Sequence, residues 1–189
     1  MTVWDSSKRY AADATEIAPA PCQRFEDFRG ISRGQLENFY KCGYTAPTPI
    51  QAQSWPIAMA DRDMVSIAKT GSGKTLAFLL PAYKKMDARR GPNGVINVLI
   101  LAPTRELATQ IQEEAEKFGH VAGYYSTCAY GGAPRGGQLE AIRRGVSIVV
   151  ATPGRLNDFI DSNKIDLSSV FYLVLDEADR YLFTINVSC

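Results

Sequence analysis

Short runs of wholly apolar residues alternate with helix-forming stretches over most of this sequence, and this alternation constrains the fold more than any other feature. The apolar runs predict strands at 64–67, 95–101, 126–130, 146–150 and 171–175. Helical spacing of apolar residues predicts helices at 74–85, 105–118, 138–144 and 156–160. Apolar strands that alternate with helices form a parallel sheet whose two faces are both covered. The sequence therefore predicts an α/β domain with helices on both faces of a parallel sheet.

The N-terminal part of the sequence has a different texture. Residues 1–24 are polar and rich in Ala and Pro, which predicts a flexible tail. Globular composition begins at Phe25, so the predicted domain is 25–189. Ser32 and Gln35 form the pattern of a capping box, which predicts a helix that ends at Gly43. A second helix is expected from residue 50 to about residue 60.

Composition excludes several classes of protein. The 189 residues are 46% hydrophobic and 22% charged, with a net charge of +1, which suits one globular domain and gives no general attraction to nucleic acid. No apolar run approaches the ~20 residues of a membrane span, and no secretory signal is visible. The four cysteines form no C-x-x-C pair and His120 is the single histidine, so we expect reduced thiols in an intracellular protein, of the nucleus or the cytoplasm.

A segment of small residues follows the first predicted strand of the alternating pattern and opens a helix. It consists of Ala68, Lys69, Thr70, Gly71, Ser72, Gly73, Lys74 and Thr75. Such a loop lets backbone N–H groups converge on phosphate oxygens, and the helix dipole adds to the attraction. In loops of this type the lysine, here Lys74, reaches the β- and γ-phosphates, and the hydroxyl of Thr75 binds Mg²⁺. The segment predicts a nucleoside triphosphate site, although Ala68 stands where the usual pattern has glycine.

A pair of acidic residues ends the last predicted strand. Asp176 and Glu177 follow the apolar run 171–175, and ligands of open parallel sheets bind at the carboxyl ends of strands. Asp176 suits a Mg²⁺ ion held through water, and Glu177 suits the orientation and deprotonation of an attacking water. An acidic helix start would explain the same residues by its dipole alone, and the upstream Lys74 and Thr75 favour the catalytic interpretation. We therefore expect a triphosphate and its magnesium between the amides ahead of Lys74 and the carboxylate of Asp176.

Seven motifs in order resemble those of the first RecA-like domain of DEAD-box ATP-dependent RNA helicases. They cover about residues 25–181 and comprise Phe25 and the segments 43–51, 68–75, 103–108, 131–132, 152–155 and 176–179. The resemblance implies a RecA-like P-loop domain, and for the complete enzyme it implies ATP-dependent local unwinding of short RNA duplexes. It implies ATP and Mg²⁺ as cofactors and assigns the catalytic roles to Lys74, Asp176 and Glu177.

The resemblance also implies an adenine site. Gln51 would read the edge of adenine, because a side-chain amide donates and accepts at once. Phe25 would stack on the face of adenine, and Tyr44 belongs to the same cofactor site. Phe25 is open to a second interpretation as a core aromatic, since sequence alone does not separate stacking from packing.

Three loops would contact RNA according to the resemblance. Their residues are Pro103, Thr104, Arg105, Gly131, Gly132, Thr152, Pro153, Gly154 and Arg155. Each loop follows a predicted strand, so all three are expected on one edge of the sheet. Hydroxyls, arginines and helix N-terminal amides suit contacts to phosphate and sugar, which hold a strand without reading its sequence. Thr104 and Thr152 are also good helix caps, and Gly131 and Gly132 also suit a simple turn.

The resemblance stops near Asp179. Family members continue to a Ser-Ala-Thr motif and a second RecA-like domain, and residues 180–189 contain neither. We therefore expect a sheet that is incomplete at its C-terminal end, with unpaired edges that favour aggregation. Hydrolysis and unwinding are expected to need the second domain, whose arginine finger is worth about 10³–10⁵ in rate in related phosphoryl transfer.

Two other functions remain open at this point. The chain could be a non-catalytic module that binds RNA or regulatory and ribonucleoprotein partners and competes with a full-length helicase. It could also be a P-loop NTPase that acts on something other than nucleic acid, which the three RNA-type loops argue against. No membrane partner is expected.

Overall fold

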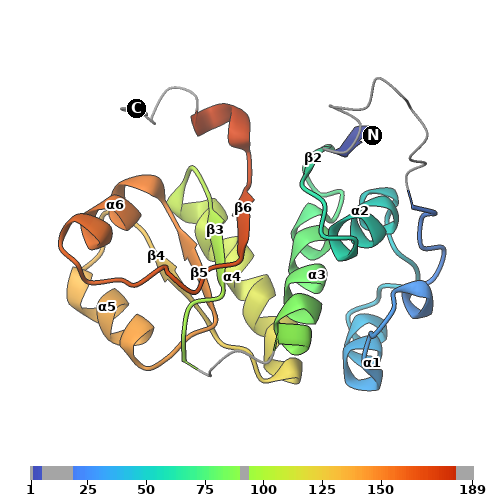
Figure 1. Cartoon of the computed structure of the whole chain (residues 1–189), viewed down its shortest axis with the longest axis horizontal. Coiled ribbons are helices and arrows are strands. Elements are labelled where there is room, and N and C mark those ends of the chain that lie inside the picture. Colours follow the sequence, from blue (N-terminus) through green and yellow to red (C-terminus); the bar gives the residue numbers. More distant parts are fainter. Residues whose placement is uncertain (1, 6–18, 90–93, 182–189) are drawn as a thin grey trace. The chain divides into compact units, whose positions relative to one another are not determined.

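The computed structural model describes residues 2–5, 19–89 and 94–181 (Figure 1). The chain divides into two compact units, Met1–Arg89 and Arg90–Cys189. Among the described residues, no helix combines the length and the apolar character that crossing a membrane requires.

The first unit is mainly helical. Its elements are β1 (Thr2–Asp5), η2 (Phe25–Asp27), α1 (Arg33–Lys41), α2 (Pro49–Met59), β2 (Met64–Ile67) and α3 (Lys74–Arg89). An aromatic cluster fills its core, where Phe25, Phe28, Phe39 and Trp55 are each at most 2% exposed. The indole Nε1 of Trp55 donates to the carbonyl oxygen of Leu76 at 3.1 Å, which ties α2 to α3.

The capping box predicted for the first helix is confirmed. The Ser32 Oγ accepts from the backbone N–H of Gln35 at 3.2 Å, and the Gln35 Oε1 accepts from the backbone N–H of Ser32 at 3.0 Å. Gly43 follows the helix with a φ of +81°, the left-handed conformation that lets a chain leave a helix. The second helix occupies Pro49–Met59, one residue earlier than expected at its start, because Pro49 suits the first turn.

Part of the predicted tail has regular structure. Thr2–Asp5 form β1, which pairs antiparallel with β2, with Thr2 opposite Ile67 and Asp5 opposite Met64. The backbone N–H of Cys22 donates to the carbonyl of Ala52 at 2.9 Å. The prediction of a flexible tail is thus wrong for these two segments. Each segment supplies hydrogen-bond partners to backbone groups of β2 or α2, and such groups seldom stay unpaired. Residues 6–18 of the predicted tail lie outside the described residues.

The second unit is built on a parallel sheet. Its elements are β3 (Val98–Leu101), α4 (Arg105–Gly119), η3 (His120–Ala122), β4 (Ser126–Ala129), α5 (Arg135–Arg143), β5 (Ile148–Ala151), α6 (Pro153–Asp161), β6 (Tyr172–Leu175) and η4 (Ala178–Tyr181). The strands lie in the order β4-β5-β3-β6, and each neighbouring pair is parallel. The helices α5 and α6 begin at 135 and 153, each three residues earlier than predicted.

Helices cover both faces of this sheet, as the sequence predicted. On one face, Leu99 and Val149 pack in a cluster with Ile142 of α5 and Phe159 of α6. Neighbouring residues of a strand point to opposite sides, so Ile100 and its counterparts face the other layer, where α4 packs against β4 and β5. The sheet is thus the middle of three layers.

The strand β2 pairs with β1 in a two-stranded sheet and, in the described part of the chain, has no strand pair with the four-stranded sheet. This agrees with the expected incomplete sheet, because the strand of the missing Ser-Ala-Thr motif is expected between 64–67 and 171–175. The strand β6 is the last in the order of the parallel sheet, and its Leu173 is 59% exposed and its Leu175 46% exposed. Among the described residues β6 thus has a strand neighbour on one side only, as expected for a sheet with an unpaired edge.

Candidate functional site

The glycine-rich loop lies between β2 and α3, in the predicted strand–loop–helix context. Gly71 and Gly73 have φ angles of +75° and +87°, which place both in the left-handed region. Lys74 is the first residue of α3, so the amides that precede it lie at the positive end of a 16-residue helix. The Lys74 Nζ donates to the carbonyl oxygen of Ala68 at 2.9 Å, so its ammonium group lies over the loop. The Ser72 Oγ is buried and has no partner among the described residues.

Gln51 braces this loop from α2. Its Nε2 donates to the carbonyl of Gly73 at 3.1 Å, and its Oε1 accepts from the backbone N–H of Thr48 at 3.0 Å. A Cβ added at Gly73 would lie 2.5 Å from the Gln51 Nε2, so only glycine permits this approach. Gln51 is 1% exposed, and contact between adenine and its amide therefore requires the loop or the side chain to move. Reading of adenine by Gln51 stays a prediction.

Phe25 belongs to the core of the first unit. It is 1% exposed and stacks on Phe39, with ring centroids 4.6 Å apart. This packing favours the second interpretation of Phe25 as a core aromatic, and stacking of its ring on adenine stays a prediction. Tyr44 is half-buried and touches Phe39 edge-on at 5.9 Å between centroids. Tyr44 is the aromatic residue of the predicted cofactor set that retains exposed surface.

The acidic pair follows β6 in the second unit. The backbone N–H of Asp176 donates to the carbonyl of Leu101 at 3.0 Å, which continues the ladder between β6 and β3. The Asp176 Oδ1 accepts from the backbone N–H of Glu177 at 3.0 Å. Glu177 has a φ of +51°, a conformation that costs energy in a residue with a side chain and is found at functional sites. Its carboxylate pairs with the Arg180 Nε at 3.1 Å.

The three predicted RNA loops lie at one edge of the sheet. They follow β3, β4 and β5, and these strands are parallel neighbours, so their carboxyl ends share an edge. The Thr104 Oγ1 accepts from the backbone N–H of Leu107 at 3.2 Å, which makes Thr104 the cap of α4. Thr152 precedes α6 and makes no such bond through its side chain. Gly131, Gly132 and Gly154 are exposed, and Pro103 and Pro153 are half-buried.

The two arginines of these loops differ in environment. Arg105 is exposed, and its guanidinium carbon lies 4.8 Å from the centre of the Tyr130 ring. Arg155 is 7% exposed, and its guanidinium donates to the Gln138 Oε1 at 2.8 Å and to the Ala133 carbonyl at 3.0 Å. This geometry commits the Arg155 side chain to contacts within the second unit, and contact of Arg155 with RNA stays a prediction. Gln138 is not recognisable as functional from the sequence, because a single glutamine on a helix carries no signal of its own.

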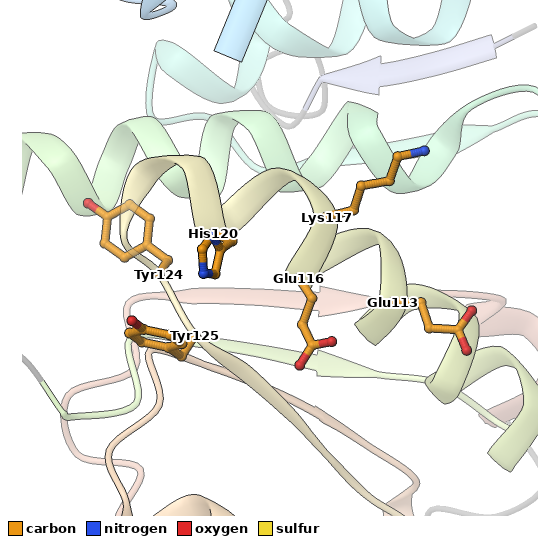
Figure 2. Close-up of a pocket in the computed structure, with 6 residues that line it drawn as sticks. All are labelled: Glu113, Glu116, Lys117, His120, Tyr124 and Tyr125. Atoms are coloured by element: carbon orange, nitrogen blue, oxygen red, sulfur yellow. The ribbon is translucent and has the colours of Figure 1, made fainter. Parts of the chain in front are cut away.

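A surface pocket of the second unit lies away from these motifs (Figure 2). It is lined by Glu113, Glu116, Lys117, His120, Tyr124 and Tyr125. These residues come from the C-terminal part of α4, from η3 and from the segment before β4, at the opposite end of α4 from Arg105. Nearby, burial raises the pKa of the Cys128 thiol to about 12, and the charges of Glu116 and Glu113 add to the effect. The pocket is therefore not the predicted nucleotide or RNA site.

The fold and these motifs define a RecA-like P-loop domain. The family model described as DEAD/DEAH box helicase matches residues 48–186. The chain belongs to this family of helicases.

Relatives extend the match over most of the chain. The ATP-dependent RNA helicase-like protein DB10 of Nicotiana sylvestris is 56% identical over 165 residues, which are 87% of this chain and 27% of that protein. DEAD-box ATP-dependent RNA helicase 46 of Arabidopsis thaliana is 56% identical over 169 residues, which are 87% of this chain and 25% of the relative. The chain thus spans about a quarter of the length of these curated relatives.

A solved structure gives the same fold. The RNA helicase Prp28 from Chaetomium thermophilum bound to ADP is 42% identical, with a TM-score of 0.79, and the match covers 87% of this chain and 41% of that chain. This similarity supports the RecA-like architecture predicted from the alternation of strands and helices.

Proposed function

We propose that this chain is the ATP-binding part of an ATP-dependent RNA helicase and that it also holds the backbone of single-stranded RNA. The observation that carries the proposal is the loop between β2 and α3, where two glycines in the left-handed region precede the helix that begins at Lys74. In a member of the DEAD/DEAH box family, this loop suits the phosphates of a nucleotide. Hydrolysis and unwinding are proposed to need a second domain.

Nucleotide binding would rearrange the loop. The ammonium group of Lys74 would leave the Ala68 carbonyl for the β- and γ-phosphates, because a phosphate oxygen carries more negative charge than a carbonyl oxygen. The exposed surface of Tyr44 would pack against the base. The Gln51 amide donates to the Gly73 carbonyl. A base that binds this amide would compete for that hydrogen bond and so change the conformation of the loop.

The oxygen donors for magnesium are present in the two motifs. Thr75 lies in the first turn of α3, and Asp176 follows β6, and hydroxyl and carboxylate oxygens are the ligands that Mg²⁺ takes beside its waters. When bound, the ion supplies Lewis-acid polarisation of phosphate oxygens. Glu177 would orient the attacking water and accept its proton. The Glu177 carboxylate pairs with the Arg180 Nε at 3.1 Å, which restrains the side chain.

The RNA part of the proposal is supported by the shared edge of β3, β4 and β5. Exposed glycines leave backbone N–H groups open to phosphate oxygens, and the N-termini of α4 and α6 add their dipoles. Arg105 supplies an exposed cation at this edge. Regulatory or ribonucleoprotein partners belong to the same proposal for the longer protein.

A second function is favoured by the location of the RNA loops. All three lie in the second unit, so binding of RNA without nucleotide would suit a non-catalytic competitor of a full-length helicase. RNA affinity that ignores ATP would support this function over the first.

Lys74→Ala tests the nucleotide part. We expect it to weaken binding of a fluorescent ADP or ATP analogue by at least tenfold, because a charged partner of the phosphates is lost. Lys41→Ala is the matched control, since Lys41 is an exposed lysine in the last turn of α1. Nucleotide affinity of folded Lys74→Ala equal to that of the control would contradict the proposal.

A further inference from the structure

Gln138 joins two segments that the proposed function places against RNA. Its Nε2 donates to the carbonyl oxygen of Tyr130 at 3.0 Å, and Tyr130 immediately precedes Gly131. Its Oε1 accepts from the Arg155 guanidinium at 2.8 Å. One amide in the first turn of α5 therefore links the loop after β4 to the start of α6.

Arg155 also binds the loop that contains Gly131 and Gly132. Its second terminal nitrogen donates to the carbonyl of Ala133 at 3.0 Å. Tyr130 and Ala133 flank Gly131 and Gly132, so Gln138 and Arg155 hold both ends of the glycine pair by carbonyl oxygens. The amides of the exposed glycines between them stay available to a ligand, because the holding bonds use carbonyls only.

The same group of residues also contacts the loop after β3, which carries Arg105. The Arg105 guanidinium lies over the Tyr130 ring, 4.8 Å from its centre. On the far side of Arg155, the Nε lies 3.7 Å from the Asp158 Oδ2, a distance that suits an ion pair and is too long for a hydrogen bond. Asp158 also accepts from Arg135 at 2.8 Å. Residues at the starts of α4, α5 and α6 are thus connected through Gln138 and Arg155.

We propose that Gln138 and Arg155 are positioning residues that fix the three RNA-facing loops relative to one another, a role that rests on the proposed binding of RNA. Arg155 acts through Gln138 and Ala133 and does not contact phosphate, because it is 7% exposed and each of its terminal nitrogens already donates to one of these residues. Loss of Gln138 should lower RNA affinity, because the loops are then no longer held in place. The number of phosphate contacts should stay unchanged, because Gln138 carries no charge.

The first test compares Gln138→Ala with Gln110→Ala in the 189-residue chain. Gln110 is an exposed glutamine of α4 and controls for the change in helix propensity. Anisotropy of a labelled oligouridine should show roughly tenfold weaker binding for Gln138→Ala, the factor that about 1.4 kcal/mol represents, and no change for Gln110→Ala. Gln138→Glu keeps the acceptor for Arg155 and loses the donor to Tyr130, and it should also weaken binding if Gln138→Ala fails to fold.

The salt dependence of binding separates positioning from phosphate contact. Arg105→Ala should reduce the slope of log K against log salt by about 0.7, the value for one phosphate contact to a single strand. Gln138→Ala and Arg155→Ala should leave this slope unchanged, a result that loss of a direct phosphate contact does not predict. A slope reduced by about 0.7 in Arg155→Ala would overturn the positioning role of Arg155.

A double-mutant cycle completes the test. If both residues act through the same loop, Gln138→Ala combined with Arg155→Ala should weaken binding no more than the stronger single variant. Additive losses would overturn the proposal, as would RNA affinity of Gln138→Ala equal to that of Gln110→Ala. If the wild-type chain binds nucleotide and no RNA, the RNA part of the proposed function is contradicted. This outcome differs from failure of the positioning role, in which the wild-type chain binds RNA and the variants bind it equally well.

Discussion

The strands that carry the nucleotide motifs are covered less well than the strands that carry the RNA motifs. In β3 and β5 most side chains are buried, including Val149 and Ile100 at 0% exposure. In β2 and β6 every second side chain is exposed, and Val65 and Ile67 are each 61% exposed. The edge that holds the RNA loops is thus built on a well-packed sheet, whereas the loop with Lys74 and the acids after β6 follow strands with one open face. Substitutions in the two regions should therefore have unequal effects.

The largest effect is expected in the aromatic core of the first unit. Phe25→Ala should lower the free energy of unfolding by about 3–5 kcal/mol, because a fully packed ring is removed. Phe25→Leu should keep the fold and the affinity for nucleotide, since the ring packs on Phe39. Tyr44→Ala should show the reverse, with lower nucleotide affinity and a smaller loss of stability. Urea denaturation and a nucleotide titration measure both quantities, and a strong loss of nucleotide affinity in folded Phe25→Leu would restore the stacking role.

A pair of isosteric substitutions tests the difference in coverage directly. Val149→Thr should cost about 1–3 kcal/mol, because it buries a hydroxyl group between the sheet and the layer of α5 and α6. Val65→Thr should change stability by less than about 0.5 kcal/mol, because this side chain of β2 is exposed. Urea midpoints of the two variants provide the measurement. Equal losses would mean that β2 is covered in solution as well as β5 is.

The open face of β6 predicts a change in solubility. Leu173→Lys replaces a 59% exposed apolar side chain by a charged one, which disfavours association of strand edges. We expect less aggregation at high protein concentration in static light scattering, with little change in the urea midpoint. Ile160→Lys, an exposed position of α6, is the control, and an equal gain in both variants would argue against a special role of the β6 edge.

The smallest effect concerns acid stability of the first unit. The backbone N–H of Arg24 lowers the pKa of the Asp27 carboxyl, and the Arg24 guanidinium and the Gln23 N–H add to this. A lowered pKa in the folded state means that the stabilisation is present above the ordinary pKa of aspartate and is lost as the pH falls below it. Asp27→Asn should therefore lose less stability than the wild type between neutral pH and about pH 3. Urea midpoints at the two pH values provide the check. An identical loss in both proteins would contradict a contribution of Asp27 to acid stability.

The sequence predicted those parts of the fold that depend on interactions between residues close together in the chain. The capping box at Ser32 and Gln35 and the layered sheet follow from hydrogen-bond capacity and from the period of apolar residues. The pairing of β1 with β2 was not predictable, since Thr2–Asp5 are only four residues long and the partner lies about 60 residues away.

The candidate site was predictable in its motifs and less so in the role of each side chain. The loop around Lys74 and the shared edge of the RNA loops lie where the sequence placed them. Phe25 and Arg155 have the residue types that stacking and phosphate contact require, yet both are buried by neighbours from other elements. Gln138 became visible only once Tyr130 and Arg155 were brought within hydrogen-bond distance of it.

The claim that a nucleotide and its magnesium engage both the loop ahead of Lys74 and the carboxylate of Asp176 is tested most directly by amide chemical shifts. Titration of the ¹⁵N-labelled chain with ATP and Mg²⁺ should shift the amide signals of Gly71, Gly73 and Lys74 together with those of Asp176 and Glu177. The signals of Ser126–Ala129 in β4 should stay in place. Saturating nucleotide that leaves either motif unshifted, or that shifts β4 instead, would contradict the account.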